Sequence, residues 1–95
     1  PTKRYSTEEQ YNYEKTIRIF QKRIDNIVDA GHPQVRTSCI ILGSRAGAGY
    51  ITKAEAEQLA TCLIENNSYL QKNLKGYIDT AMWAIREGYK SPKYY

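Results

Sequence analysis

The chain has 95 residues and a formal net charge of +4, with 41% apolar and 25% charged residues. This length suits one domain with a single modest core, and the composition is ordinary for a soluble globular protein. No apolar run approaches the roughly 20 residues that span a bilayer, and the polar start is unlike a signal peptide, so we expect a cytoplasmic protein without membrane contact. The chain begins at Pro1 rather than at Met, which suggests a fragment of a larger protein.

The first predicted helix begins at Ser6-Thr7-Glu8-Glu9, which has the spacing of a capping box and places acidic residues at the positive end of the helix dipole. Gly31 is expected to supply the left-handed residue that ends this helix. Pro33 should begin the next helix, where a missing amide costs nothing. Apolar residues recur on one face of the first helix at spacings of three and four: Tyr13, Ile17, Phe20, Ile24, Ile27 and Val28.

The second predicted helix runs from Pro33 to Ser44 or Ala46, and the small residues at positions 43–49 should form a close helix-to-helix turn. The third runs from Thr52 to Glu65, and Thr52 and Glu55 have capping-box spacing. The apolar face of the third helix is expected to comprise Ala56, Leu59, Ala60, Leu63 and Ile64.

The fourth predicted helix starts near Ser68 and ends at Gly88, unless a break at Gly76 delays its start to Tyr77. No segment sustains the two-residue alternation that is typical of strands. We therefore predict an all-α fold, a compact bundle of about four helices in one domain over residues 1–88, with residues 89–95 as an extended tail or linker. The predicted core is Ile17, Phe20, Ile24, Val35, Cys39, Leu42, Leu59, Leu63, Leu74, Ile78, Met82 and Ile85.

The sequence offers little for catalysis, metal binding or cofactor binding. Cys39 and Cys62 lie in apolar helical stretches and are predicted to be buried reduced thiols, and no Cys/His cluster suggests zinc. The glycine-rich segment 43–49 lacks the Lys-Ser/Thr ending of a phosphate loop. The single histidine, His32, has no matching nucleophile and acid. We expect no catalytic residue, no metal and no cofactor, and hence no enzyme activity in this chain alone.

Basic residues are the more informative signal. Tyr11, Lys15, Arg18 and Lys22 follow spacings of four, three and four, which places them on one face of the first helix, nearly opposite its apolar arc. We call these four residues the basic stripe. It could contact nucleic acid or simply be a solvated helix face.

For several residues outside the stripe, the sequence also leaves open whether they contact nucleic acid or have a structural role. Arg36 and Arg45 frame the second helix, and Arg36 could contact nucleic acid or pair with an acid such as Glu57. Trp83 could anchor in the core, stay half-buried, or stack on a base. The tail places Tyr89, Tyr94 and Tyr95 among lysines, so it could be a flexible nucleic-acid contact or a linker.

A longer pattern runs through the second half of the chain. It comprises Arg36, an apolar run to Leu42, Ala48-Gly49-Tyr50-Ile51, Glu55-Ala56, Asn66-Asn67-Ser68-Tyr69-Leu70 and Thr80-Ala81-Met82-Trp83-Ala84-Ile85-Arg86-Glu87-Gly88. Over roughly residues 32–93 this order resembles the small helical domain that follows the catalytic domain in primases and primase-helicases of phages and other mobile elements.

The resemblance implies a DNA-replication role without catalysis. The metal-binding acids of such proteins belong to a separate domain, the arginine at the start of the second helix recurs in the family, and the tail would lead to a helicase domain. One interpretation is an accessory domain that contacts single-stranded nucleic acid or nucleotide, as template, initiating nucleotide or primer. The other is a structural or protein-interaction module. Convergence of Arg18, Lys22, Arg36 and Arg45 on one face would favour the first, and their scattering among Glu and Asp residues would favour the second.

Overall fold

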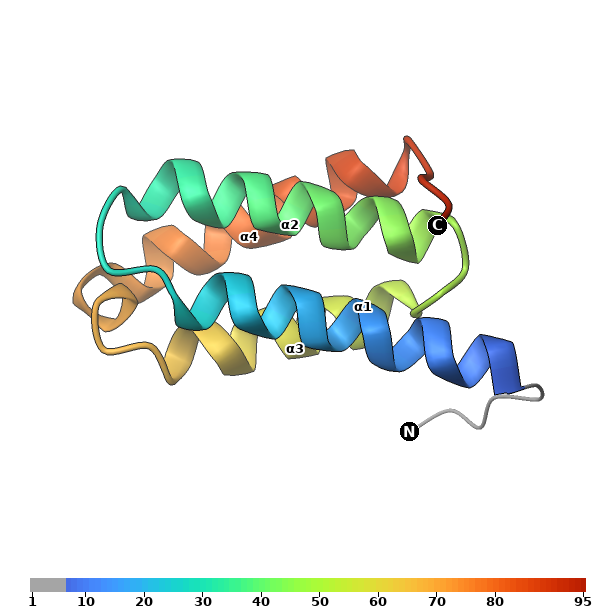
Figure 1. Cartoon of the computed structure of the whole chain (residues 1–95). Helices are drawn as coiled ribbons and strands as arrows, with labels where there is room; N and C mark the ends of the chain where they lie inside the picture. Colours follow the sequence, from blue (N-terminus) through green and yellow to red (C-terminus); the bar gives the residue numbers. More distant parts are fainter. Residues whose placement is uncertain (1–6) are drawn as a thin grey trace.

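The computed structural model describes residues 7–95 (Figure 1). Its helices are α1 (Thr7–Asp25), α2 (Gly31–Gly47), α3 (Lys53–Glu65) and α4 (Leu74–Tyr89), with a short 3₁₀ turn, η1 (Leu70–Asn73), before α4. No strand occurs in the described range. The predicted all-α bundle of four helices is confirmed, while Ser6 of the expected first cap lies outside the described residues. None of the described helices is long and apolar enough to cross a membrane.

The helices alternate in direction along one long axis. α1 and α3 run one way and α2 and α4 the other, so α2 and α4 are parallel to each other (Figure 1). Their packing confirms this direction, because successive glycines of α2 meet successive residues of α4: Gly31 meets Tyr77, and Gly43 meets Ile85. Helices α2 and α4 form the most extensive contact in the bundle.

Two glycines allow α2 and α4 to approach this closely. A Cβ on Gly43 would lie 2.9 Å from the Cα and carbonyl carbon of Ile85, and closer still to its oxygen. A Cβ on Gly88 would likewise lie 2.9 Å from the carbonyl carbon of Ile40. Ordinary contact begins at 3.4 Å, so any other residue here would push backbone against backbone. The small residues that the sequence placed in a turn therefore serve helix packing as well.

The core agrees with the predicted one and extends it. Phe20, Ile24, Val35, Cys39, Leu42, Leu63 and Ile85 are buried, and the other five predicted members pack half-buried against them. Ten further apolar residues of the described range are buried, and five of them are alanines. These additional buried residues are Ile27, Ala46, Ile51, Ala56, Ala60, Ile64, Leu70, Tyr77, Ala81 and Ala84.

The end of the first helix differs from the prediction. α1 stops at Asp25, so Val28 leaves the helical face and is 73% exposed. Ala30, at φ 47°, takes the left-handed conformation that was expected of Gly31. Gly31 is the first residue of α2 and is buried, and a Cβ there would overlap the Tyr77 ring. Tyr77 thus requires a glycine at position 31, and the strained turn falls one residue earlier.

The third helix begins as predicted. The Thr52 hydroxyl accepts a hydrogen bond from the Glu55 amide at 3.1 Å, and the Glu55 carboxylate accepts one from the Thr52 amide at 3.0 Å. The second oxygen of the Glu55 carboxylate accepts a hydrogen bond from the Tyr13 hydroxyl at 3.2 Å. The capping box therefore also fixes α3 against α1.

The start of the fourth helix was predicted wrongly. Asn67, not Ser68, organises this segment: its Oδ1 accepts from the amides of Tyr69 and Leu70 at 2.9 and 3.0 Å. Its Nδ2 donates to the carbonyls of Ile24 and Ile27, at 2.9 and 3.2 Å. The asparagine thus ties this turn to the end of α1, and α4 begins only at Leu74. Gly76 lies inside α4 and breaks nothing.

The two cysteines also have different environments. Both are free thiols, and Cys39 is buried as predicted. Cys62 is exposed, which contradicts the prediction, because it lies on the outer face of α3 beside Glu57, Gln58 and Glu65. Burial raises the pKa of the Cys39 thiol to about 12.

Candidate nucleic-acid interface

Helices α1 and α2 enclose a groove that contains arginines and no carboxylate. One part of it is a small cavity of about 30 Å³, and the other is an open cleft of about 410 Å³. The two parts share Arg23 and Ser38, and together we call them the α1–α2 groove. Its lining comprises Thr16, Ile19, Phe20, Arg23, Asn26, Pro33, Gln34, Thr37, Ser38, Ile41, Leu42, Arg45 and Tyr95.

Arg23 lies at the junction of the two parts. Its Nε donates a hydrogen bond to the hydroxyl of Ser38 at 3.2 Å, and Ser38 itself is only 3% exposed. A guanidinium has five N–H donors, and the described residues engage only this one of Arg23. The side chain is exposed. Arg23 is thus held at its base and presents free donors to the groove.

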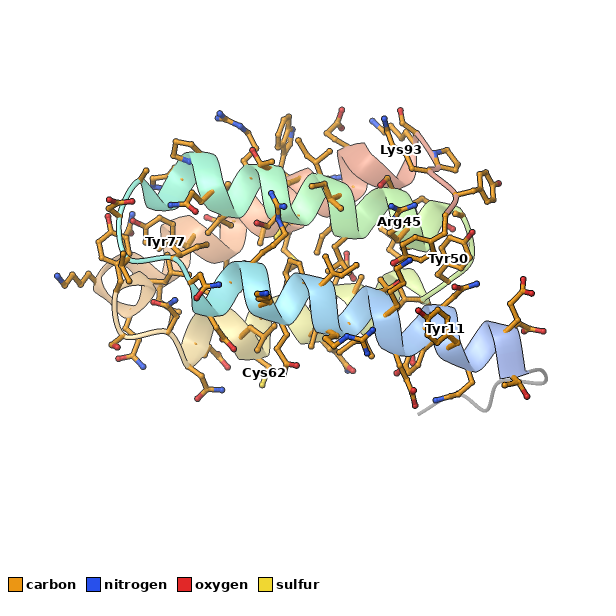
Figure 2. The ribbon with its side chains drawn as sticks, in the orientation of Figure 1. Tyr11, Arg45, Tyr50, Cys62, Tyr77 and Lys93 are labelled. Carbon is orange, nitrogen blue, oxygen red and sulfur yellow. The ribbon has the colours of Figure 1, made fainter. Side chains whose placement is uncertain are left out.

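The far end of the groove is closed by Tyr95. Its ring lies under two cations, with the Lys15 ammonium 4.3 Å and the Arg45 guanidinium 3.9 Å from the ring centroid. The Tyr50 ring lies 4.7 Å away at a tilt of 37°, and the hydroxyls of Tyr95 and Thr16 share a hydrogen bond of 2.6 Å. We call Lys15, Thr16, Arg45 and Tyr50 the Tyr95 cradle. Figure 2 shows Arg45 and Tyr50 at the same end of the bundle, where Tyr11 also lies.

The tail backbone is held against the same end of α2. The Lys93 amide donates to the Ser44 carbonyl at 3.1 Å, and Arg45 donates to the Lys93 carbonyl at 2.8 Å. The Tyr95 amide donates to the Tyr50 hydroxyl at 3.1 Å. The tail after Tyr89 is non-helical, and it turns back against the end of α2 (Figure 1).

The basic stripe keeps its predicted face, but its members differ in surroundings. Tyr11 is 57% exposed, and Arg18 and Lys22 are exposed without a partner among the described residues. Lys15 is half-buried under its contact with Tyr95. The stripe therefore runs beside the α1–α2 groove, and Lys15 connects the two.

The arginines of α2 separate, so Arg18, Lys22, Arg36 and Arg45 do not all converge on one face, and this test does not favour the accessory-domain interpretation over the interaction module. Arg45 joins Lys15 in the Tyr95 cradle. Arg36 is exposed, lines neither part of the groove, and makes no ion pair with Glu57 or any other described acid. The structure thus brings Lys15 and Arg45 together, and it adds Arg23, which the sequence analysis missed. The available signal was position: Thr16, Ile19 and Arg23 follow spacings of three and four beside the stripe.

No acidic side chain lines the groove, but α1 itself carries Glu8, Glu9, Glu14 and Asp25, and Asp29 follows in the loop before α2. Glu57 and Glu65 line a shallow depression on the outer face of α3, and Glu55 borders the cleft between α1 and α3. Two carboxylates of α4, Asp79 and Glu87, form exposed ion pairs with neighbouring lysines. Helices α1 and α2 together carry six basic and four acidic side chains, whereas α3 carries one basic and three acidic ones.

The described part of the chain contains no group of side chains arranged for metal binding or acid–base catalysis. No three His, Cys, Asp or Glu residues there gather closely enough to hold a metal ion. His32 shares a hydrogen bond of 3.1 Å with the Thr80 hydroxyl, and its ring packs 4.5 Å from that of Tyr77. Its position is accounted for by the contact between α2 and α4. Trp83 is 46% exposed and is not a core residue.

Comparison with protein-family models, with curated proteins and with solved structures gives no match to this chain. The geometry described above therefore carries the functional argument, and the resemblance to primases rests on the sequence pattern alone.

Proposed function

We propose that this chain is a non-catalytic accessory domain that binds single-stranded nucleic acid weakly and without sequence preference. The observation that carries the proposal is the α1–α2 groove, which is lined by Arg23 and Arg45 and has no acid in its lining. Lys15, Arg18 and Lys22 lie beside it on α1, and the whole chain has a net charge of +4.

The proposed mechanism is electrostatic positioning. Guanidinium groups bind phosphate oxygens with two N–H donors, so Arg23 would grip one phosphate while Ser38 fixes its orientation. Each neutralised phosphate releases counterions, which supplies most of the affinity of a sequence-independent binder. The Asn26 amide and the Thr37 hydroxyl offer further contacts to the backbone of the strand, whereas the Gln34 amide already donates to Asp29. Aromatic rings at the cradle end can stack on bases.

We further propose that the parent protein is a DNA-replication primase or primase-helicase of a phage or another mobile element. The support is the sequence pattern over residues 32–93. In such a protein the domain would hold template, initiating nucleotide or nascent primer beside the catalytic domain, and the catalytic acids would come from elsewhere. The chain would itself need neither cofactor nor metal.

The test is a titration of a labelled oligonucleotide of about 20 nucleotides at several salt concentrations. If about four basic groups contact phosphates, the slope of log affinity against log salt should be near −3, since a single strand contributes about −0.7 for each contact. Arg23→Glu should weaken binding strongly and flatten this slope. Arg86→Glu is the matched control, because Arg86 is exposed on α4 outside the groove and its replacement changes the net charge equally.

Two outcomes would count against the proposal. Equal losses for Arg23→Glu and Arg86→Glu would mean that net charge alone attracts the strand and that the groove is not the site. Absence of binding by the wild-type chain at low salt would refute the proposal. Arg36→Glu, measured beside them, shows whether the arginine highlighted by the primase resemblance contributes from outside the groove.

A second candidate function is a protein-interaction module, which spaces domains or docks a replication partner. It is favoured by apolar side chains left exposed on α2 and α4: Trp83 is 46%, Tyr89 44% and Ile40 36% exposed. Trp83 is the only tryptophan of the chain, so its fluorescence is a direct reporter. A blue shift on adding an adjoining primase or helicase domain, with no change on adding oligonucleotide, would favour this function.

A further inference from the structure

The Tyr95 cradle has the composition of a stacking site for a nucleobase. Tyr50 offers a ring face, as the aromatic platforms of single-strand binders do, and Lys15 and Arg45 offer positive charge beside it. Thr16 supplies a hydroxyl for a hydrogen bond. These groups come from α1, from α2 and from the loop after α2, so they converge only in the folded chain.

The occupant of this site is a residue of the chain itself. We infer that Tyr95 is an intramolecular competitor, which fills the stacking site until a single-stranded nucleic acid displaces it. The Tyr95 ring satisfies the same groups that a base and its phosphate would use: the ring stacks near Tyr50, and both cations lie over its face. The inference rests on the proposed function, because it assigns a regulatory contact to one end of the α1–α2 groove.

The contacts suit a competitor that can be displaced. Tyr95 is 41% exposed and Tyr94 is 69% exposed, so the tail buries little apolar surface. Segments held mainly by solvent-exposed hydrogen bonds open at low free energy, without unfolding of the core. A phosphate would form charge-assisted bonds with Lys15 and Arg45, whereas the tail offers both cations the π face of Tyr95 and offers Arg45 the neutral carbonyl of Lys93. A strand therefore has more to gain in the cradle than the tail does.

The expected change in strand affinity depends on the fraction of molecules in which Tyr95 occupies the cradle. If the tail occupies the cradle about nine-tenths of the time, the apparent affinity for a strand is about tenfold weaker than that of the open form. Tyr95→Ala should remove this competition and tighten binding by up to about tenfold. The substitution keeps Lys90 and Lys93, so the net charge and the long-range attraction are unchanged. Tyr94→Ala is the matched control, because its ring meets Tyr50 only edge-on, at 6.3 Å.

Two substitutions at Tyr50 separate competition from a purely structural role. Tyr50→Phe removes the hydroxyl that accepts from the Tyr95 amide but keeps the ring, so it should loosen the tail and tighten strand binding. Tyr50→Ala removes the stacking surface itself, so it should weaken binding, also in the Tyr95→Ala background. A general loss of stability would not make strand binding tighter in Tyr50→Phe and weaker in Tyr50→Ala.

The experiment is titration of one labelled oligodeoxythymidine with the wild-type chain, the four single variants and the Tyr50→Ala, Tyr95→Ala double variant, with circular dichroism to confirm that each is folded. Tighter binding by Tyr95→Ala and Tyr50→Phe, with Tyr94→Ala unchanged, supports the inference. Wild-type binding that Tyr95→Ala leaves unchanged or weakens overturns it, and leaves the proposed function intact. Failure of both the wild type and Tyr95→Ala to bind overturns the proposed function instead.

Discussion

Replacement of Gly43 by alanine tests the closest helix contact in the bundle. In most helices this change stabilises by about 0.8–1.0 kcal/mol, because alanine loses less backbone entropy than glycine. Here the added methyl would lie 2.9 Å from the Cα and carbonyl carbon of Ile85, well inside the 3.4 Å at which ordinary contact begins. These are backbone atoms, so no side-chain rotation relieves the overlap, and α2 and α4 must move apart.

The expected cost is at the upper end of the range for an overfilled core, about 3 kcal/mol net. For a domain of this size, each kcal/mol lowers the melting temperature by roughly 4–8 °C, so Gly43→Ala should melt roughly 12–24 °C below the wild type. Thermal unfolding followed by circular dichroism at 222 nm measures this directly.

Gly76→Ala is the matched control. Gly76 is also helical, but the atoms that a Cβ would meet belong to the end of the Asn73 side chain, which can rotate away. The usual helix preference should then prevail, with a gain of up to about 1 kcal/mol. A Gly43→Ala chain as stable as the wild type, or a Gly76→Ala chain that loses as much as Gly43→Ala, would refute the close parallel packing of α2 and α4.

Four further experiments test other parts of the structure. Thr52→Ala should lower the free energy of unfolding by about 0.5–2 kcal/mol in urea titrations, because one amide at the start of α3 loses its partner; an unchanged midpoint would contradict the capping box. A thiol reagent at pH 8 should label Cys62 at once and Cys39 only on unfolding. The pKa of Cys39 is raised from 9.0 to about 12, so its contribution is fully present below pH 9 and is lost as pH rises towards 12, by about 1.4 kcal/mol per unit relative to Cys39→Ala. Gly47→Ala would place a methyl 2.5 Å from the carbonyl oxygen of Tyr89 and 3.3 Å from Pro92 Cγ, so it should displace the end of α4 together with the tail and should tighten strand binding as Tyr95→Ala does; binding equal to that of the wild type would argue against a role of the tail.

Sequence patterns predicted correctly those features that depend on residues close together in the chain. The Thr52–Glu55 capping box uses atoms three residues apart, and the apolar period of α1 identifies Phe20 and Ile24, which are 2% and 0% exposed. Both follow from helix geometry and need no knowledge of the partner helix. The number of helices and most of the core were predictable for this reason.

The features that the sequence did not predict depend on contacts between residues far apart in the chain. Ser68 has capping-box spacing, yet Asn67 organises the turn, because its amide reaches carbonyls of residues 24 and 27 that no local pattern reveals. Gly31 is glycine because the Tyr77 ring lies against it, and the left-handed residue moves to Ala30. Arg23 could not be distinguished from its neighbours until Ser38 was known to face it across the groove.

The close contact between α2 and α4 also explains why the sequence did not predict that Tyr95 occupies one end of the candidate site. Gly43 and Gly88 let α4 lie directly against α2, so α4 ends beside the last turn of α2, where the Lys93 amide reaches the Ser44 carbonyl. From there Tyr95 reaches α1, and it takes up two of the six residues that were predicted to bind nucleic acid, Lys15 and Arg45. Helix packing in one part of the bundle therefore sets how much of the basic surface is available in another. The proposed site and the glycine contacts are consequently coupled, and a change that loosens α2 from α4 should alter strand binding as well as stability.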